Sequence, residues 1–249
     1  MARDLAAQDG FALIAEASAE PTGTAGSYVE ARGRNTIVIG PGANAALSTE
    51  FLQQQSVLAN AKVVLVQLES PVQTIEAALA AAREAGVTTV LNAAPADAPS
   101  SIGLLKLADV LTPNETEFAS LLGRHVGERV DADDVAALDG ASLHALCRKL
   151  VGNGTVVVTL GAVGVFVSHA DENLRGDTQP YYRVGAEQVQ AIDTTGAGDA
   201  FNGALAASIA QVPAAPFARH VRFANQFAGR STEKEGAAAA MPRFTPADA

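Results

Sequence analysis

The stretch KVVLVQLESPVQTIEAALAAAREAG, residues 62–86, contains an apolar run followed directly by a helical pattern. The run Lys62–Leu68 has no polar alternation, which is typical of a strand that is covered on both faces. Ser70 and Pro71 offer an N-cap and a first-turn proline, the Ala-rich segment after them predicts a helix, and Gly86 predicts its end. A strand that leads at once into a helix is the repeating unit of a parallel α/β sheet.

The same alternation continues along the chain. Residues 87–95 predict a second strand, and residues 108–123 predict a short strand, a turn at Pro113 and a helix that Asn114 caps. Further elements are predicted as a helix at 142–151, a buried strand at Gly154–Gly161, a β-meander at 163–192, and helices at Gly198–Ile209 and Pro216–Arg230. Repeated strand–helix–strand units indicate an α/β fold with a mostly parallel sheet and helices on its faces.

The segment before Lys62 follows a different pattern. Two short runs flank Arg32-Gly33-Arg34 and predict a two-stranded ribbon, a flap rather than a layer of the sheet. We therefore expect two units, an entry segment with this ribbon at residues 1–40 and an α/β domain at residues 41–249.

The bulk composition excludes several classes of protein. The 249 residues carry a formal net charge of −10, which argues against a nucleic-acid partner or an anionic membrane surface. The start shows no secretory signal, and no apolar run approaches the ~18 residues of a membrane span, so a cytoplasmic protein is expected. Cys147 is the only cysteine, which excludes an internal disulfide. The 4 histidines lack the spacing of a zinc site or a catalytic triad, and we expect them near the surface.

Polar residues and glycines end several of the predicted strands. Ligands of parallel sheets bind beyond the carboxyl ends of the strands, so residues at these ends should lie together. The residues concerned are Glu69, Asn92, Asn114, Thr159, Gly161 and Asp193.

The segment AIDTTGAGDAFNGALAAS, residues 191–208, combines a glycine-rich turn with a helix start. Gly196 and Gly198 permit a turn whose backbone N–H groups point one way, and the helix terminus adds a partial positive charge. This arrangement suits a phosphate, beside which Asp199 could accept the proton of an attacking hydroxyl. The helix terminus should favour the ionised form of Asp199. The alternative is an ordinary turn in which Asp199 only complements the helix dipole.

Three other motifs each have two interpretations. Asn114 and Glu117 could order a hydrated Mg²⁺ near phosphates, or they could form a capping box. Residues 159–164 (TLGAVG) could hold a nucleotide, or they could be a plain β-turn. Glu69 could accept hydrogen bonds from sugar hydroxyls, or it could be a helix-start acid before Pro71.

Taken together, the motifs resemble the ribokinase-like (phosphofructokinase-B) carbohydrate kinases. VIGPGAN, VQLES, LNAAPA, TPNETE, VVVTLGAVGV, DTTGAGDAFNGALA and ANQFAGRSTEKEGAAAAMP follow the order of that family between Thr22 and Pro242. The resemblance implies a three-layer α/β sandwich with a mostly parallel central sheet and a small β lid, which would be the ribbon at Thr22–Ile39. It implies ATP-dependent phosphorylation of a sugar hydroxymethyl group, with D-ribose and ATP as substrates and with Mg²⁺ and K⁺. A homodimer formed through the lid is also consistent with it.

The resemblance assigns roles to matching residues. It implies Asp199 as catalytic base, with Gly196, Ala197 and Gly198 as anion hole, and Glu69 and Asp199 as ribose ligands. The implied nucleotide contacts are Asn114, Thr159, Leu160, Gly161, Ala162, Val163, Gly164, Gly198 and Asn225. The implied metal regions are Asn114 and Glu117 for magnesium, and Asp193, Thr195, Ser231, Lys234 and Gly236 for potassium.

The chain departs from the family pattern at three places. Ala93 replaces a usual proline, and Lys234 stands where arginine is usual. The family's initial strand and its GGKGANQA segment do not appear, so we expect the amino-terminal strands to be missing and the chain to be a poor sugar kinase by itself. A related sugar or nucleoside kinase and a truncated nucleotide-binding pseudokinase remain the alternatives.

Overall fold

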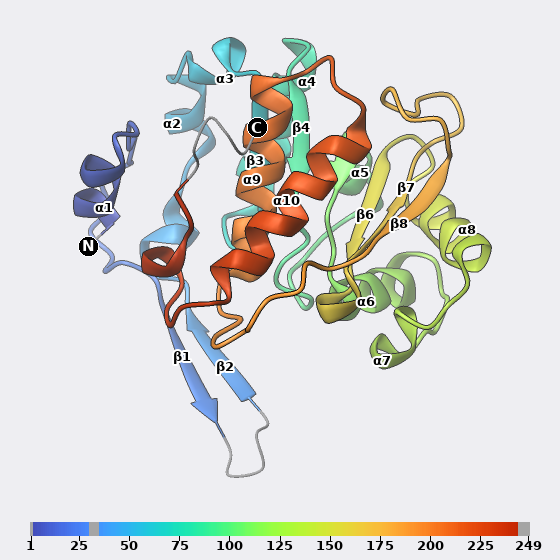
Figure 1. Cartoon of the computed structure of the whole chain (residues 1–249). Coiled ribbons are helices and arrows are strands. Elements are labelled where there is room, and N and C mark those ends of the chain that lie inside the picture. The colour runs from blue at the N-terminus through green and yellow to red at the C-terminus, as the bar shows by residue number, and fades with distance from the viewer. Residues whose placement is uncertain (1, 30–34, 244–249) are drawn as a thin grey trace.

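The central feature of the computed structural model, which describes residues 2–29 and 35–243, is a 6-stranded sheet with the order β3-β4-β5-β6-β7-β8 (Figure 1). Its strands are β3 (Val63–Val66), β4 (Thr88–Leu91), β5 (Val110–Leu111), β6 (Thr155–Thr159), β7 (Val165–Ser168) and β8 (Tyr181–Val184). Strands β3 to β6 pair in parallel, whereas β7 and β8 pair antiparallel. The predicted α/β class with a mostly parallel sheet is confirmed.

Helices cover both faces of the sheet and make it the middle of three layers (Figure 1). On one face lie α4 (Val72–Glu84), α5 (Ile102–Lys106), α6 (Glu115–His125), α7 (Ala132–Val135) and α8 (Gly140–Leu150). On the other face lie α9 (Ala197–Gln211) and α10 (Phe217–Ser231). Strand β6 shows why its apolar run is continuous: Val156 and Val158 join the first core, and Val157 joins the second. None of the described helices is both long and apolar enough to cross a membrane.

The remaining elements surround this sandwich. A separate antiparallel pair, β1 (Thr24–Val29) and β2 (Asn35–Gly40), forms the predicted ribbon, which projects from one end of the molecule (Figure 1). Its predicted turn at 32–34 lies outside the described residues. The short elements are α1 (Ala2–Asp9), α2 (Thr49–Gln53), α3 (Val57–Asn60), and the 3₁₀ turns η1 (Gly42–Ala46), η2 (Gly161–Val163) and η3 (Ala238–Ala240).

Several predicted boundaries need correction. Pro71 itself occupies the N-cap position of α4 and no side chain caps that helix, so Ser70 does not have the predicted role. Helix α6 continues past Gly123 to His125. The predicted meander ends with β8, because residues 185–192 form no regular strand. These residues instead run along the surface toward the turn before α9.

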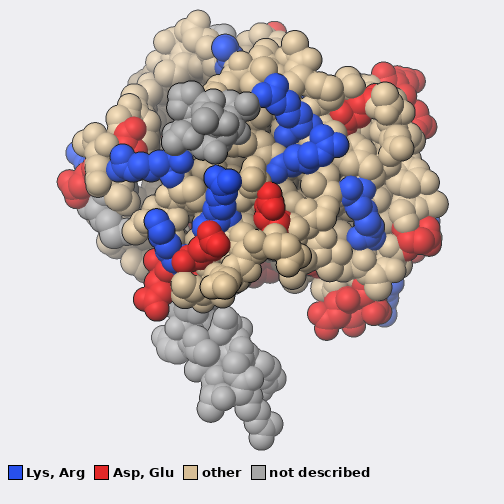
Figure 2. Space-filling model, in the orientation of Figure 1, with Lys and Arg blue, Asp and Glu red and all other residues tan. Residues whose placement is uncertain are grey.

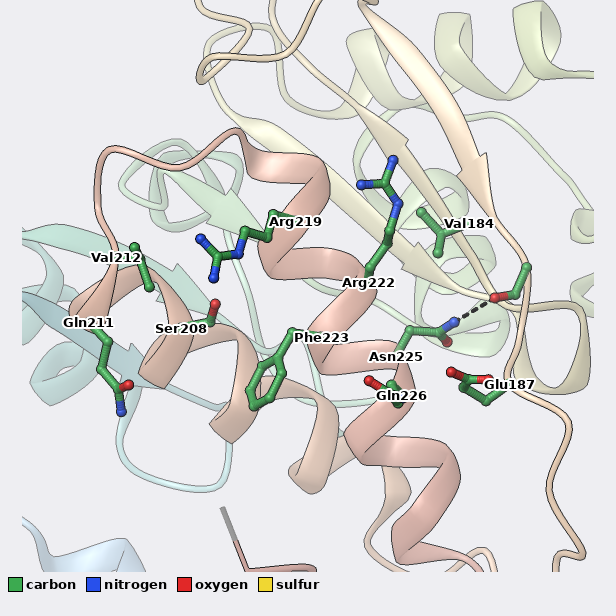
Figure 3. Close-up of a pocket in the computed structure, with 11 residues that line it drawn as sticks. Val184, Glu187, Ser208, Gln211, Val212, Arg219, Arg222, Phe223, Asn225 and Gln226 are labelled. Atoms are coloured by element: carbon green, nitrogen blue, oxygen red, sulfur yellow. Dashed lines mark hydrogen bonds between the residues drawn. The ribbon is translucent and has the colours of Figure 1, made fainter. Parts of the chain in front are cut away.

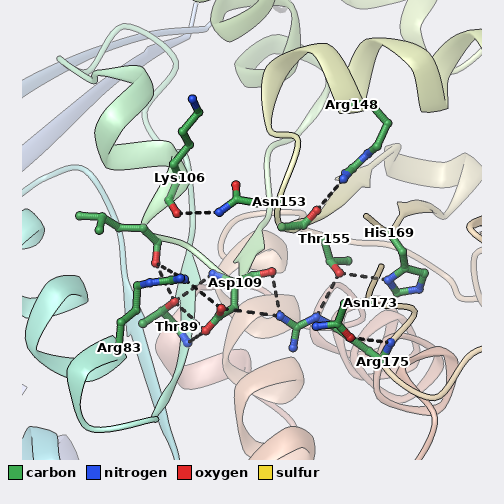
Figure 4. Close-up of polar contacts among 12 residues, drawn as sticks. Arg83, Thr89, Lys106, Asp109, Arg148, Asn153, Thr155, His169, Asn173 and Arg175 are labelled. Carbon is green, nitrogen blue, oxygen red and sulfur yellow. Dashed lines mark hydrogen bonds and ion pairs between the residues drawn. The ribbon is translucent and has the colours of Figure 1, made fainter. Parts of the chain in front are cut away.

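A polar network fastens the amino-terminal edge of the sheet (Figure 4). Asp109, directly before β5, accepts hydrogen bonds from the Thr89 amide at 2.9 Å and from Arg83 Nη1 at 3.0 Å. Arg175 donates to the Asp109 carbonyl oxygen at 3.0 Å and to the Thr155 hydroxyl at 3.1 Å. These bonds join β4, the residue before β5, β6 and the loop that contains Arg175. They lie at the edge of the sheet opposite the candidate site.

Two histidines are buried, contrary to the sequence-based expectation. The His169 side chain is 0% exposed and lies between the Thr155 hydroxyl and the Asp177 carboxylate, each at 3.0 Å. Burial lowers the pKa of His169. His220 is also buried and bonds Ser208. These hydrogen-bond partners lie 8 to 14 residues away in the chain, and the sequence pattern around each histidine does not identify them.

Candidate active site

The carboxyl ends of the parallel strands meet at one edge, as predicted. Asn92 donates its amide to Val66 O of β3, and Thr159 donates its amide to Pro113 O beside Asn114. Asn114 and Thr159 also form an isolated bridge, so the TPNETE and TLGAVG segments lie side by side.

Helix α9 begins at this same edge, and a pair of polar side chains holds it there. Thr112, which follows β5, donates its hydroxyl to Asn202 Oδ1 at 2.6 Å. Asn202 in turn donates Nδ2 to Gly198 O at 2.9 Å. Both Thr112 and Asn202 are buried. This link ties the first turn of α9 to the sheet and was missed from the sequence, because 90 residues separate its partners.

The glycine-rich turn presents unbonded amides at the start of α9. Gly196 has φ 79°, a left-handed conformation that glycine adopts without strain. The Ala197 amide is used within the turn, since it donates to Thr194 O. Within residues 2–29 and 35–243, the amides of Gly196, Gly198 and Asp199 meet no backbone or side-chain acceptor. The turn can therefore offer three N–H groups and a helix terminus to an anion.

Asp199 lies beside these amides with a carboxylate that no described side chain or amide bonds. By area its residue is exposed, yet enough protein surrounds the carboxyl group for desolvation to raise its pKa. Desolvation thus shifts the pKa of Asp199 in the direction opposite to the one expected from the helix terminus. A carboxylate with a raised pKa is a better proton acceptor than an ordinary aspartate.

The TLGAVG turn and Asn225 are brought together through the end of β8. A side chain at Gly164, where φ is 110°, would meet Val184 O at 2.1 Å and Ala186 N at 2.7 Å, so the turn lies directly against this segment. Asn225 on α10 donates Nδ2 to Gly185 O at 2.7 Å (Figure 3). Residues 184–186 thus contact both the TLGAVG turn and Asn225.

A groove of 450 Å³ continues from Asn225 along α10. Arg219 and Arg222 of α10 line it together with Ser208 and Gln211 of α9 (Figure 3). The face that carries α10 shows Lys and Arg side chains over much of its centre, with acidic groups among them and further acidic groups toward its margins (Figure 2). The groove lining carries these two arginines and one acid, Glu187, and this local excess of positive charge favours anionic ligands. The two arginines were missed, because their i, i+3 spacing alone predicts only an exposed helix face.

Asn114 and Glu117 form a complete capping box. The Asn114 side chain accepts the Glu117 amide at 2.8 Å, and Glu117 Oε2 accepts the Asn114 amide at 2.9 Å. Glu117 is buried, and burial raises the pKa of its carboxyl group. The structural interpretation of this pair is confirmed. The described residues contain no group of three His, Cys, Asp or Glu side chains that could hold a metal ion.

Asp193 connects the turn before α9 with the loop after α10. Its Oδ1 accepts the Thr195 amide and its Oδ2 accepts the Gly236 amide, each at 2.9 Å. A hydrogen bond from the Thr195 side chain, followed by those from the Gly236 and Thr195 amides, lowers the pKa of Asp193 to about 2, so it remains ionised. Ser231 is buried and donates to Ala228 O within its own helix, while Lys234 is exposed. The structure thus brings together three of the five predicted potassium-site residues.

Glu69 lines a second cavity, of 660 Å³, between the ribbon and the ends of β3 and β4. Gly23–Ala25 and Ile39–Pro41 form its ribbon side, and Pro95 to Pro99 form its far wall. Among the described residues, Asp199 does not belong to the lining of this cavity. A cavity of this size that combines two acids, Glu69 and Asp97, with apolar walls has the character of a small-molecule site.

Comparisons with known proteins agree with this geometry. Residues 13–243 match the model of the pfkB family carbohydrate kinases. The chain is 38% identical over 228 residues to a ribokinase of Haemophilus influenzae, with 90% of this chain and 67% of the relative covered. It is 37% identical to a ribokinase of Mus musculus, with 89% and 64% covered.

Solved structures give the same result. An Arabidopsis thaliana ribokinase complexed with ribose and ATP superposes with a TM-score of 0.70 at 30% identity, with 90% of this chain and 67% of that chain covered. A Giardia lamblia ribokinase superposes with a TM-score of 0.80 at 26% identity, with 97% and 76% covered. The chain spans about two thirds of the length of most of these proteins.

Proposed function

The chain belongs to the pfkB family of carbohydrate kinases, and we propose that it transfers the γ-phosphoryl group of ATP to the 5-hydroxyl of D-ribose. The observation that carries the proposal is the position of Asp199, an unbonded carboxylate with a raised pKa beside the free amides of Gly196 and Gly198. The similarity to ribokinases, one of them complexed with ribose and ATP, supports the choice of substrates.

In this proposal each group at the start of α9 has one task. Asp199 takes the proton of the attacking sugar hydroxyl while the phosphoryl group is transferred. The amides of Gly196 and Gly198, with the helix terminus, stabilise the charge on the phosphoryl oxygens. Glu69 accepts hydrogen bonds from sugar hydroxyls within the cavity between the ribbon and the ends of β3 and β4.

We propose that the nucleotide and the magnesium ion bind at the neighbouring strand ends. We propose that Thr159 to Gly164 and Asn225 contact the nucleotide, since Gly164 and Asn225 both contact the segment around Gly185. Asn114 Oδ1 and both Glu117 carboxylate oxygens already accept hydrogen bonds within the capping box beside Thr159, so we propose that the pair orders a hydrated Mg²⁺ through the water molecules of the ion. A magnesium ion there would neutralise charge on the phosphates.

A direct assay tests the proposal. The purified chain is incubated with ATP and Mg²⁺, and ADP release is measured with D-ribose, with 2-deoxyribose, with adenosine and without acceptor. We expect ribose to support the highest kcat/KM. Faster release with adenosine would make the chain a nucleoside kinase. ATP binding without acceptor-dependent ADP release would make it a nucleotide-binding protein that lacks sugar kinase activity.

We propose further that a potassium ion binds at Asp193, Thr195 and the loop to Gly236, where an ionised carboxylate and a loop backbone fit a monovalent cation. Bound there, it would steady the turn of the anion hole without touching the sugar. Replacing K⁺ by tetramethylammonium at constant ionic strength should therefore lower kcat and leave the KM for ribose nearly constant. Equal rates in the two salts would remove the potassium site and leave the kinase proposal intact.

The ribbon formed by β1 and β2 is proposed to act as the lid over the sugar cavity and as a surface for dimerisation. Val38 is 58% exposed and Ile39 is 45% exposed on this separate two-stranded sheet. A two-stranded sheet is marginally stable without a partner, and apolar side chains on its surface favour association.

A further inference from the structure

The far wall of the sugar cavity is an irregular loop between β4 and α5. Pro95, Asp97, Ala98 and Pro99 of this loop line the cavity opposite the ribbon. Its backbone has little regular hydrogen bonding to the sheet, apart from Ala94 O, which accepts the Leu68 amide at 2.9 Å. The shape of this wall therefore depends on contacts with side chains.

Arg124, near the end of α6, provides most of these contacts. Its Nη2 donates to Ala96 O at 2.8 Å, and its Nη1 donates to Ala98 O and, at 3.3 Å, to Ser100 Oγ. Ser120, one turn earlier on α6, also binds the loop, because its hydroxyl donates a hydrogen bond to Ala96 O at 2.7 Å. The planar guanidinium group can bond two carbonyls at once in a fixed geometry, which an ammonium group does not reproduce.

The same helix begins at the phosphate side of the candidate site. Asn114 caps α6, and Glu117 in its first turn is buried at the strand ends. Phe118, Leu121 and Leu122 anchor the helix in the core, so α6 is a rigid element. Arg124 therefore fixes the position of the cavity's far wall relative to α6, the helix that carries the proposed phosphate and magnesium region.

We propose that Arg124 is a positioning residue for the sugar: it fixes the 94–100 loop, and through that loop the fit of the cavity, without contacting the sugar itself. The inference rests on the proposed sugar kinase function for its kinetic consequence. Its structural part, the ordering of the loop by Arg124, stands apart from catalysis and is measured separately.

The test compares R124A with R129A, which removes an arginine that makes no hydrogen bond within the described part of the chain. R124A should raise the KM for D-ribose about tenfold or more, since several hydrogen bonds and the loop geometry are lost. The KM for ATP should stay within about twofold of wild type, a difference of only about 0.4 kcal/mol. R124K should recover part of the ribose affinity, and R129A should leave both constants unchanged.

Hydrogen exchange of the backbone amides provides the readout that needs no activity. R124A should speed exchange in residues 94–100 and leave β6 protected. Unchanged exchange in the loop, or equal changes in both KM values, would overturn the proposal. If R124A does not fold, S120A tests the same loop and should shift exchange and ribose KM in the same direction, whereas no shift would overturn it. A wild-type chain that never phosphorylates ribose would refute the proposed function, and loop exchange would still decide whether Arg124 orders the wall.

Discussion

Asp199→Asn should lower ribose-dependent ADP formation by about 10²–10⁴-fold, because the amide cannot accept the proton of the attacking hydroxyl. ATP binding should persist, since backbone amides and Asn225 remain in place. The measurement is kcat with saturating ribose and ATP, together with ATP binding by calorimetry. Asp134→Asn is the matched control, because it makes the same charge change at an exposed acid in the first turn of α7. A D199N variant that retains more than about a tenth of wild-type kcat would argue against a base role.

The same residue sets an expected pH dependence. Burial raises the pKa of Asp199, and a general base works only in its deprotonated form. As the pH falls, kcat/KM should therefore decline at a higher pH than an ordinary aspartate would cause. The decline should be absent from the residual activity of D199N. Identical acid limbs in the two proteins would assign the titration to another group.

Among the substitutions considered, Gly164→Ala should lower the free energy of unfolding most, by about 2–4 kcal/mol. Gly164 has φ 110° and ψ −126°, and its added Cβ would lie 2.1 Å from Val184 O. Backbone must move to relieve this contact, and the segment around Gly185 that contacts Asn225 would move with it. The measurement is urea unfolding with and without ATP, and ATP should stabilise the variant less than wild type.

Gly185→Ala is the matched control for that prediction. It adds the same methyl group to the segment that Gly164 contacts, but nothing lies within 4 Å of the new Cβ and φ is not positive. Its free energy of unfolding should stay within about 0.5 kcal/mol of wild type. If G164A were as stable as G185A, the close packing of the turn against β8 would be wrong.

The sequence by itself determined the layered fold and the edge at which the site lies. The valines of β6 alternate between the two cores, so their unbroken apolar run specified a strand buried on both faces. The Asn114–Glu117 spacing predicted a capping box as one of two interpretations, and Gly196 and Gly198 predicted the turn before α9. Each of these features is set by residues close together in the chain, where period, spacing and backbone preference act directly.

The tertiary structure alone decided the long-range hydrogen bonds, the burial of individual polar side chains and the pKa of Asp199. The hydrogen bonds from Thr112 to Asn202 and from Arg124 to Ala96 O join segments that local sequence patterns cannot pair, and the burial of His169 also depends on the packing of the folded chain. The pKa of Asp199 shows the same limit: the helix terminus is visible in the sequence and would lower it, whereas the surrounding protein that raises it is assembled only on folding. Desolvation and long-range hydrogen bonding depend on which segments meet in space, and only the folded chain brings those segments together.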